Sequence, residues 1–285
     1  MRKTVFCAAM AFSLASFPAL AFEAEFLSAS TADLENPHDI KLSRDGRYLF
    51  VSDLGNNRVA VLDAETLKMK GTIGEDEQRG PHDVDLDASG RLLVADTHNH
   101  RIAIYELDGI EGRLVESLSD GIRKPEGVLA GSEGRVFATG AGSDNLVVFL
   151  DGAVRKEIGD LSAPHDVEFA PNRDVWIADA ANDRLVRVNQ DLGIETILSG
   201  DPYGFSGPRY LDVAPDGTLV VADKYSHSVK VIAESGEVIG VIGTGEPGLG
   251  PNVFKTPEGV ELRGDTVWLS DSGNDRIVKY RLTWD

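Results

Sequence analysis

Six residues that suit acid–base or metal chemistry each follow a proline at regular intervals along this 285-residue chain. They are His38, His82, Glu126, His165, Arg209 and Glu258, and the prolines before them recur every 39 to 49 residues. Imidazoles and carboxylates hold divalent metals and transfer protons, and a guanidinium binds anions. A fold that brings these positions together would make a reactive centre.

Alternate repeats supply the best candidate set for a metal. His82, His165 and Glu258 offer two imidazoles and one carboxylate, which zinc or another divalent metal such as iron accepts. His38 lies opposite His165 and would join only across a narrow channel. The competing interpretation is that Pro-His-Asp is shared turn chemistry, in which each aspartate accepts local backbone N–H groups.

A second set of positions lies two residues beyond the end of an apolar run in each repeat. Four of these six positions hold glycine or alanine, and the exceptions are His98 and Tyr225. In a catalytic interpretation, Tyr225 would be the general base, and Arg209 or His98 would orient the substrate.

The same order of local patterns recurs six times. An alternating run comes first, then a turn dipeptide such as Asp45–Gly46, then an apolar run ending in aspartate, then a basic residue with another apolar run. A period of about 40–50 residues built from short strands predicts a β-propeller. The predicted blades cover residues 36–75, 80–120, 124–160, 163–203, 207–247 and 256–283. Because the first strand of each blade lines the channel, the six residues after the prolines should meet at one mouth.

The two ends of the chain predict how the ring closes. Only three strands fit after Pro257, and one further strand, Glu23–Ala29, precedes the first repeat. We expect that strand to become the outer strand of the last blade. The fold class is all-β, and helices should be few because no stretch has a sustained 3.6-residue period.

An aspartate ends one apolar run in five repeats, and arginine follows it five positions later in four of them. The four pairs are Asp53/Arg58, Asp96/Arg101, Asp179/Arg184 and Asp271/Arg276. The third repeat lacks both residues and has Gly140 and Asn145, whereas in the fifth Asp223 faces Ser228. Because aspartate and arginine occur together in four repeats and are both missing from the third, we predict a charge-assisted hydrogen bond between two strands. These aspartates would then be structural and not catalytic.

Residues 1–21 have the pattern of a secretory signal, with basic Arg2 and Lys3, an apolar stretch and a small-residue cleavage site. Residues 22–285 would then be one propeller domain in the periplasm or outside the cell. Cys7, the only cysteine, falls inside the signal, so the mature chain would carry no thiol. The apolar stretch is too short for a membrane span, and none is expected after the signal is removed.

Net charge excludes one class of partner. The chain carries −19 at pH 7, and loss of Arg2 and Lys3 makes it −21. A surface this acidic repels phosphate backbones, so we expect no nucleic acid partner.

The segment Asp96–Ile102, DTHNHRI, resembles the signature of the NHL repeat, and DLGNNRV, DAANDRLV and DSGNDRIV are variants of it. The resemblance extends over the whole of residues 22–285 and implies a six-bladed NHL propeller. It says little about function, since such propellers include both binding platforms and enzymes.

A partial resemblance to the peptidylglycine amidating lyases implies a more specific activity. His82 and His165 match the Pro-His segments with which that family holds zinc, and Tyr225 matches the place of its catalytic tyrosine. The chain departs from the pattern in having Glu258 at the third histidine position. It also has Gly140 and Ala141 where a substrate-binding arginine would be expected.

Two functions from different classes therefore stay open. The first is an exported, non-catalytic platform that binds a peptide, glycan or protein at the propeller face, with a metal site at the channel mouth. The alternative is a metal-dependent lyase or hydrolase that resembles the amidating lyases. The sequence contains no nucleophile elbow, P-loop or dinucleotide fingerprint.

Overall fold

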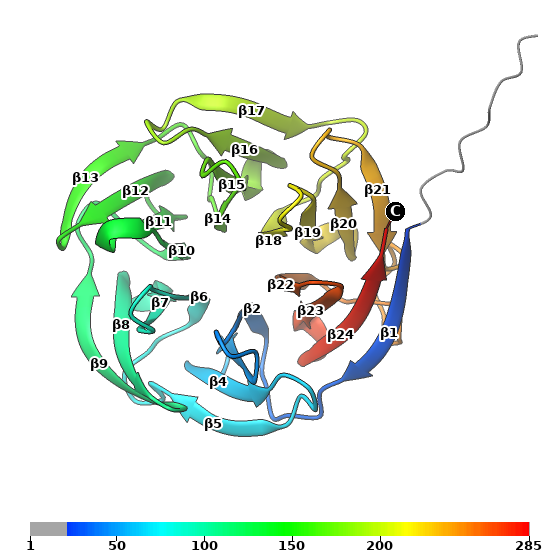
Figure 1. The fold of residues 1–285 in the computed structure, drawn as a ribbon, viewed down its shortest axis with the longest axis horizontal. Helices are drawn as coiled ribbons and strands as arrows, with labels where there is room; N and C mark the ends of the chain where they lie inside the picture. The colour runs from blue at the N-terminus through cyan, green and yellow to red at the C-terminus, as the bar shows by residue number, and fades with distance from the viewer. Residues whose placement is uncertain (1–21, 285) are drawn as a thin grey trace, which may run out of the picture.

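The computed structural model describes residues 22–284, which form six four-stranded antiparallel sheets around a central axis (Figure 1). This arrangement confirms the predicted all-β, six-bladed β-propeller. The predicted signal, residues 1–21, lies outside the described residues. Within residues 22–284, no helix has the length and apolar character needed to cross a membrane.

Each blade runs from an inner strand at the axis to an outer strand at the rim. Blade 1 contains β2 (Pro37–Leu42), β3 (Tyr48–Asp53), β4 (Arg58–Asp63) and β5 (Met69–Ile73). Blade 2 contains β6 (Pro81–Leu86), β7 (Leu92–Asp96), β8 (Arg101–Asp108) and β9 (Glu111–Leu118). Blade 3 contains β10 (Pro125–Ala130), β11 (Val136–Gly140), β12 (Asn145–Leu150) and β13 (Ala153–Ile158).

The second half of the ring repeats this order. Blade 4 contains β14 (Val167–Phe169), β15 (Val175–Asp179), β16 (Arg184–Val188) and β17 (Ile194–Ser199). Blade 5 contains β18 (Pro208–Val213), β19 (Leu219–Asp223), β20 (Ser228–Ile232) and β21 (Val238–Ile242). Blade 6 contains β22 (Pro257–Arg263), β23 (Thr266–Asp271), β24 (Arg276–Thr283) and β1 (Glu23–Ala29).

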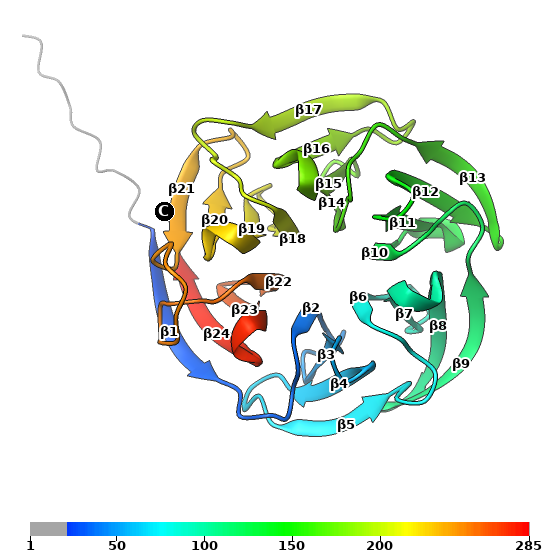
Figure 2. The ribbon, with the colours of Figure 1, turned by 180° about the vertical axis from the view of Figure 1, so that it is seen from behind.

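Helical structure among residues 22–284 is limited to short 3-10 turns. They are η1 (Thr97–Asn99), η2 (Ser132–Gly134), η3 (Ala180–Asn182), η4 (Lys224–Ser226) and η5 (Ser272–Asn274). All but η2 connect the second and third strands of a blade, on the face seen in Figure 2.

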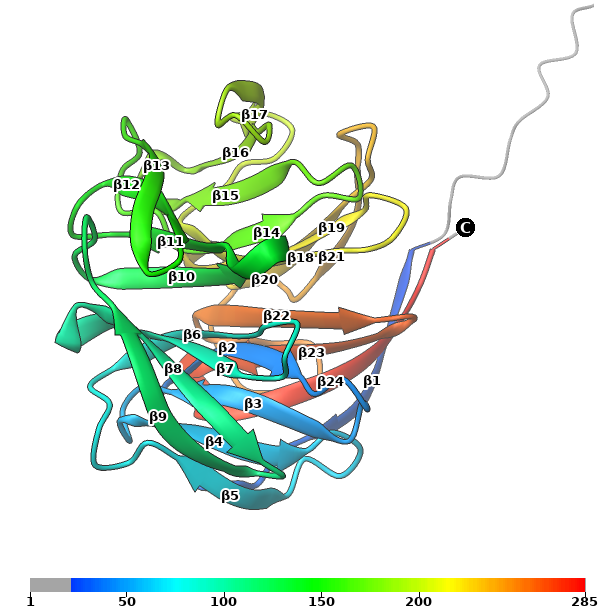
Figure 3. The same cartoon turned by 60° about the vertical axis from the view of Figure 1, so that its left-hand side comes forward.

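The N-terminal strand closes the ring as predicted. β1 pairs antiparallel with β24, from Glu23 opposite Thr283 to Ala29 opposite Val278. In the side view, β22, β23, β24 and β1 follow one another from the axis to the rim (Figure 3). The last blade is therefore built from both ends of the chain.

A bulge after the proline shapes the inner strand of five blades. In blade 1 the pairing of β2 with β3 skips from Pro37 to Ile40, and β6, β10, β18 and β22 have a similar irregularity. A bulge leaves residues unpaired and redirects their side chains. In blade 1 the bulge allows the side chains of both His38 and Asp39 to lie in the central channel.

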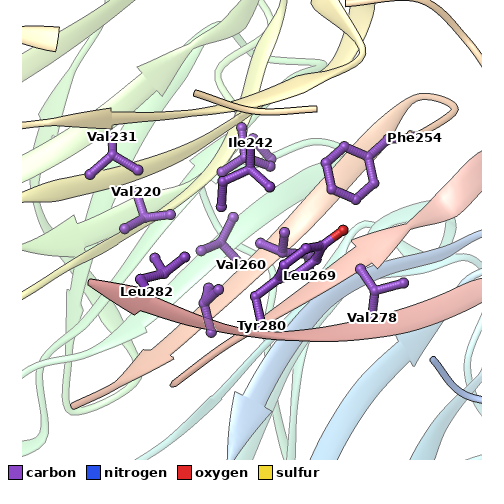
Figure 4. Close-up of a cluster of buried hydrophobic side chains, with 12 residues drawn as sticks. Val220, Val231, Ile242, Phe254, Val260, Leu269, Val278, Tyr280 and Leu282 are labelled. Carbon is purple, nitrogen blue, oxygen red and sulfur yellow. The ribbon is translucent and has the colours of Figure 1, made fainter. Parts of the chain in front are cut away.

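The hydrophobic core consists of layers between neighbouring blades. One such layer joins blades 5 and 6, where Val220 and Val231 face Val260 and Leu269, and Tyr280 packs beside them (Figure 4). Both faces of each sheet are covered, so β-branched and aromatic side chains dominate the strands.

The predicted aspartate–arginine pairs are confirmed. The arginine Nε lies 2.6–2.8 Å from a carboxylate oxygen in all four blades that have both residues. In blade 5, Lys230 takes the place of the arginine and contacts Asp223. In blade 3, which lacks the pair, Asn145 donates instead to the carbonyl of Gly121 at 2.9 Å.

The seams between blades share one hydrogen bond. The residue before each of the six repeat prolines has a positive φ, and its N–H donates to a side chain of the preceding blade at 2.7–3.1 Å. The six acceptors, in chain order, are Asn57, His100, Asp144, Asp183, His227 and Asp275, which also have positive φ. Asparagine, aspartate and histidine tolerate this left-handed region best among residues with a Cβ. The mouth of the channel is thus fixed by six equivalent bonds.

We predict that Asp271→Ala will destabilise the protein by about 3–5 kcal/mol, because it removes one partner of a buried ion pair. Asp271 accepts hydrogen bonds from the Arg276 guanidinium and from the backbone N–H of Lys255. The change leaves the guanidinium without its carboxylate and the N–H without its acceptor. Urea unfolding followed by circular dichroism measures the loss. Glu25→Ala breaks an exposed pair with Arg281 and should cost no more than about 1 kcal/mol. Equal losses in both variants would contradict the structural role.

Candidate functional site

The six residues that follow the prolines form an unbroken ring of side-chain contacts around the channel mouth. We call His38, His82, Glu126, His165, Arg209 and Glu258 the mouth ring. Its sequence-predicted convergence is observed: each member touches the next, and Glu258 completes the circle by approaching His38 at 3.6 Å. All but Arg209 are buried, which is unusual for so many polar groups.

Two histidines of the mouth ring are held in one tautomer. Nδ1 of His82 lies 3.0 Å from the carbonyl of Gly80, and Nδ1 of His165 lies 2.9 Å from the carbonyl of Ala163. Each Nδ1 therefore carries the proton and donates a hydrogen bond to that carbonyl. The two Nε2 atoms are left as acceptors, and both face Glu126, at 3.1 Å and 3.5 Å.

Burial sets the protonation states of these groups. It lowers the pKa of all three ring histidines well below 6.5, so they are neutral at pH 7. Burial, and then the charge of Glu258, raises the pKa of Glu126 to about 8. At neutral pH a protonated Glu126 is therefore in place to donate to an imidazole Nε2.

The other side of the mouth is cationic. Arg209 lies against the imidazole of His165 and comes within 4.0 Å of Glu258, which Lys224 also contacts. Within residues 22–284, five polar atoms of the mouth ring are buried without an aligned hydrogen bond: Nδ1 of His38, Oε2 of Glu126, Nε of Arg209 and both carboxylate oxygens of Glu258. Buried polar groups are normally satisfied, so these atoms are available to bond to water, an ion or a ligand.

Tyr225 and His98 stand at the rim on opposite blades. Tyr225 is 57% exposed and accepts a hydrogen bond of 3.3 Å from Nη2 of Arg209. His98 is exposed too, with its ring 6.2 Å from that of His82. A Cβ on Gly80 would come within 2.6 Å of the His98 ring, and one on Gly207 within 2.8 Å of the Tyr225 ring. Glycine at these two positions lets the rings lie directly on the backbone.

Tyr210 closes the channel below the mouth ring. Its ring is fully buried, 6.4 Å from the rings of both His38 and His165, and its hydroxyl donates to the carbonyl of Glu126 at 3.1 Å. Tyr210 and Lys224 were not predicted from the sequence, and Glu126 was predicted at the mouth but not among the metal ligands. For Tyr210 a signal existed, since it is the one aromatic residue among the six positions that follow the mouth ring.

The structure does not turn the three predicted metal ligands, His82, His165 and Glu258, toward one point. His82 and His165 face Glu126, whereas Glu258 pairs with Lys224 and Arg209. As they stand within residues 22–284, no three histidine, cysteine or acidic side chains are arranged to hold a metal ion. The donor types of His82, His165 and Glu126 do suit zinc, but Arg209 would first have to leave His165. Zinc or another divalent metal stays a prediction.

Further along the channel, one lysine meets a group of buried carboxylates. Lys41 is 3.0 Å from Asp85 and 3.9 Å from Glu168. Burial raises the pKa of Asp83 to about 6 and that of Glu168 and Glu261 to about 8. Several of these carboxylates accept a backbone N–H of the next blade, as Asp85 does from Ala130 at 2.7 Å. They therefore belong to the seams between blades.

Comparison with known proteins agrees with the fold. Residues 79–105 match the NHL repeat, which confirms that repeat in blade 2. Over 97 residues, or 32% of this chain, the sequence is 31% identical to a 6-phosphogluconolactonase from Enterobacter sp. (strain 638), and the match spans 29% of that protein. The shared stretch is less than a third of either chain.

Two solved structures resemble the whole propeller. Virginiamycin B lyase from Staphylococcus aureus superposes with a TM-score of 0.63 at 16% identity, covering 92% of this chain and 100% of that one. An auxiliary nutrient binding protein from Bacteroides ovatus gives a TM-score of 0.69 at 14% identity, covering 93% and 73%. At these identities the likeness establishes the fold.

We predict that stability will fall as pH rises from about 6.5 to 8, above the range in which the lowered pKa values of the buried histidines favour the folded state as pH rises. The pKa values of Asp83, Glu168 and Glu261 are raised on folding, so the folded state binds their protons more tightly than the unfolded chain does. That stabilisation is complete below about pH 4 and is lost as pH passes through 6 to 8. The unfolding temperature should drop by about 5 °C or more across this range.

The variants Glu168→Gln and Glu261→Gln should each flatten that pH dependence, because an amide cannot ionise. The exposed Glu237→Gln is the control and should leave the slope unchanged. Calorimetry at several pH values provides the measurement. An unfolding temperature that rises toward pH 8 would refute the assignment.

Proposed function

We propose that the protein binds a small, oxygen-rich anion, such as a sugar acid, at the mouth ring. The supporting observation is an imbalance of charge in a buried site. Arg209 and Lys224 are cationic, Glu258 balances only one of them, and Glu126 is protonated at neutral pH. The chain as a whole has a net charge of −19 and repels anions at long range, so the attraction is local to this residual positive charge at the mouth.

The rim supplies further contacts for such a ligand. Tyr225 presents a ring and a hydroxyl to solvent beside Arg209, and unbonded nitrogen atoms of Arg209 and His38 offer hydrogen bonds. The 6-phosphogluconolactonase and the nutrient binding protein, as named, also handle small molecules. This proposal keeps the predicted binding role but takes a small anion as the ligand; a peptide, glycan or protein partner and an exported location stay predictions.

Titration calorimetry with gluconate tests the binding proposal. Arg209→Gln should weaken binding about tenfold or more, since a charge-assisted hydrogen bond is lost. Arg123→Gln, an exposed residue outside the mouth ring, is the matched control and should bind as the parent does. Glucose, which lacks the carboxylate, should bind at least as weakly as gluconate binds to Arg209→Gln. Equal binding of gluconate and glucose would overturn the proposal.

A second candidate function, hydrolysis of a lactone, is favoured by the contact between His82 and Glu126. A neutral imidazole acceptor and a protonated carboxyl group lie 3.1 Å apart, which is an acid–base pair ready for use. The alternative predicted from the sequence is a metal-dependent lyase or hydrolase, and this candidate is a hydrolase that works without a metal. It needs no residue beyond those of the mouth and rim.

The chemistry balances with these groups alone. Nε2 of His82 takes a proton from water, whose oxygen bonds to the lactone carbonyl carbon. Arg209 and Lys224 stabilise the oxyanion, the ring C–O bond breaks, and Glu126 protonates the leaving oxygen. A proton then passes from His82 to Glu126 across their contact, which restores both groups. If zinc were bound by His82, His165 and Glu126, it would polarise the carbonyl instead.

Proton release from glucono-δ-lactone in a pH-stat tests the hydrolase candidate. Glu126→Gln should lower kcat by about 10²–10⁴-fold, the usual size of general-acid catalysis. Activity of the parent should fall above about pH 8, because Glu126 must be protonated to act. A metal chelator should not change the rate unless the zinc prediction holds. Activity in Glu126→Gln equal to the parent's would exclude this mechanism while leaving gluconate binding intact.

A further inference from the structure

Two grooves between blades, on the face opposite the mouth, each contain a tryptophan paired with a basic residue. Trp268 in blade 6 lies opposite Lys279 in register, and Trp176 in blade 4 lies opposite Arg187. The groove between blades 6 and 1 has a volume of about 260 Å³, and that between blades 4 and 5 about 290 Å³. The two sites share a backbone and differ in how their polar groups are satisfied.

The groove between blades 6 and 1 satisfies its own polar groups. The indole N–H of Trp268 donates to the carbonyl of Ala64 at 3.0 Å. Nζ of Lys279 lies over the Trp268 ring and pairs with Glu65 at 2.5 Å. Both donors are therefore taken by the neighbouring blade.

In the groove between blades 4 and 5, the same donors have no partner in the neighbouring blade among residues 22–284. The Arg187 guanidinium lies 5.5 Å from the centroid of the Trp176 ring, and its Nε is buried without an aligned partner in residues 22–284. Its nearest carboxylate is Asp174, within its own blade, at 3.7 Å. No hydrogen bond from the indole of Trp176 is found within the described chain.

One substitution between repeats explains the difference. Arg58 in blade 1 and Ser228 in blade 5 are equivalent, because each lies opposite the aspartate that ends the second strand, Asp53 or Asp223. By the same count along the chain, Ser235 in blade 5 corresponds to Glu65 in blade 1. Serine has no charge and a short side chain. Glu234, at the position of Ala64, does line the groove, but its side chain lies against Gly217, and within residues 22–284 no ion pair joins it to Arg187. Apolar and aromatic walls remain, contributed by Leu198, Leu219 and Tyr203, whose ring stacks on Phe205.

We infer that the groove between blades 4 and 5 is a second binding site, for a small planar aromatic carboxylate. The ring would pack against Trp176 and Tyr203, and the carboxylate would accept from Arg187 and the Trp176 indole, as Glu65 and Ala64 accept in the other groove. The volume suits a ligand of one or two rings. This site is independent of the mouth ring.

Benzoate is the probe, with benzyl alcohol as its uncharged counterpart. The chain has three tryptophans, so a nitrogen-15 spectrum of the indole N–H groups reports on each. Benzoate should shift the Trp176 signal saturably and leave Trp268 unmoved, and benzyl alcohol should bind about tenfold more weakly or worse. Arg187→Gln should remove the preference for benzoate over benzyl alcohol.

The decisive variant transfers the carboxylate of one groove into the other. Ser235→Glu places the carboxylate of the closed groove into the open one, so it should pair with Arg187 and abolish the benzoate shift. Arg209→Gln alters the mouth ring and should leave that shift intact, which separates this site from the proposed anion site. A Trp176 signal that does not respond to benzoate, or a response unchanged in Ser235→Glu, would overturn the inference.

Discussion

Cyclic closure of the six blades is the constraint on which the rest of the structure depends. At every seam, a backbone N–H just before a proline is bound by a side chain from the preceding blade. The proline fixes the backbone that follows, and the bond fixes the residue before it. Six side chains are thereby delivered to one level around the axis.

Bringing those side chains together buries them, and burial determines their chemistry. Imidazoles that water would partly protonate become neutral, and the carboxyl group of Glu126 keeps its proton near neutral pH. The same effect acts deeper in the channel, where Lys41 faces several acids. The proposed anion site is thus a product of the fold's geometry combined with a few cations at the rim.

The sequence predicted the fold and the location of the mouth well, because both follow from repetition. Equivalent positions in equivalent blades must lie at equivalent heights, so six prolines were enough to place six side chains. The contacts among those side chains do not follow from spacing. Glu126 and not Glu258 meets His82 and His165, since Lys224 engages Glu258 from a rim turn of blade 5.

Other features depended on differences between repeats that only three dimensions make meaningful. Tyr210 fills the channel where other blades have aspartate or glycine, and Gly127 permits blade 4 to approach so closely that a Cβ would come within 2.2 Å of the His165 carbonyl. Ser235 is typical of a turn when its own repeat is considered alone, and its significance lies in its replacing Glu65 of blade 1. In each case the information lay in one repeat's departure from the others.

The pairing of β1 with β24 also has a bearing on how the molecule is made. Strand β1 is the first strand of residues 22–284 to be synthesised, and its only neighbour in the sheet is β24, the last of them. Until β24 has been synthesised, the nascent chain can assemble at most five complete sheets, and contacts of such long sequence separation form slowly. The leading strand must therefore wait as an unpaired edge while the rest of the protein is still being produced.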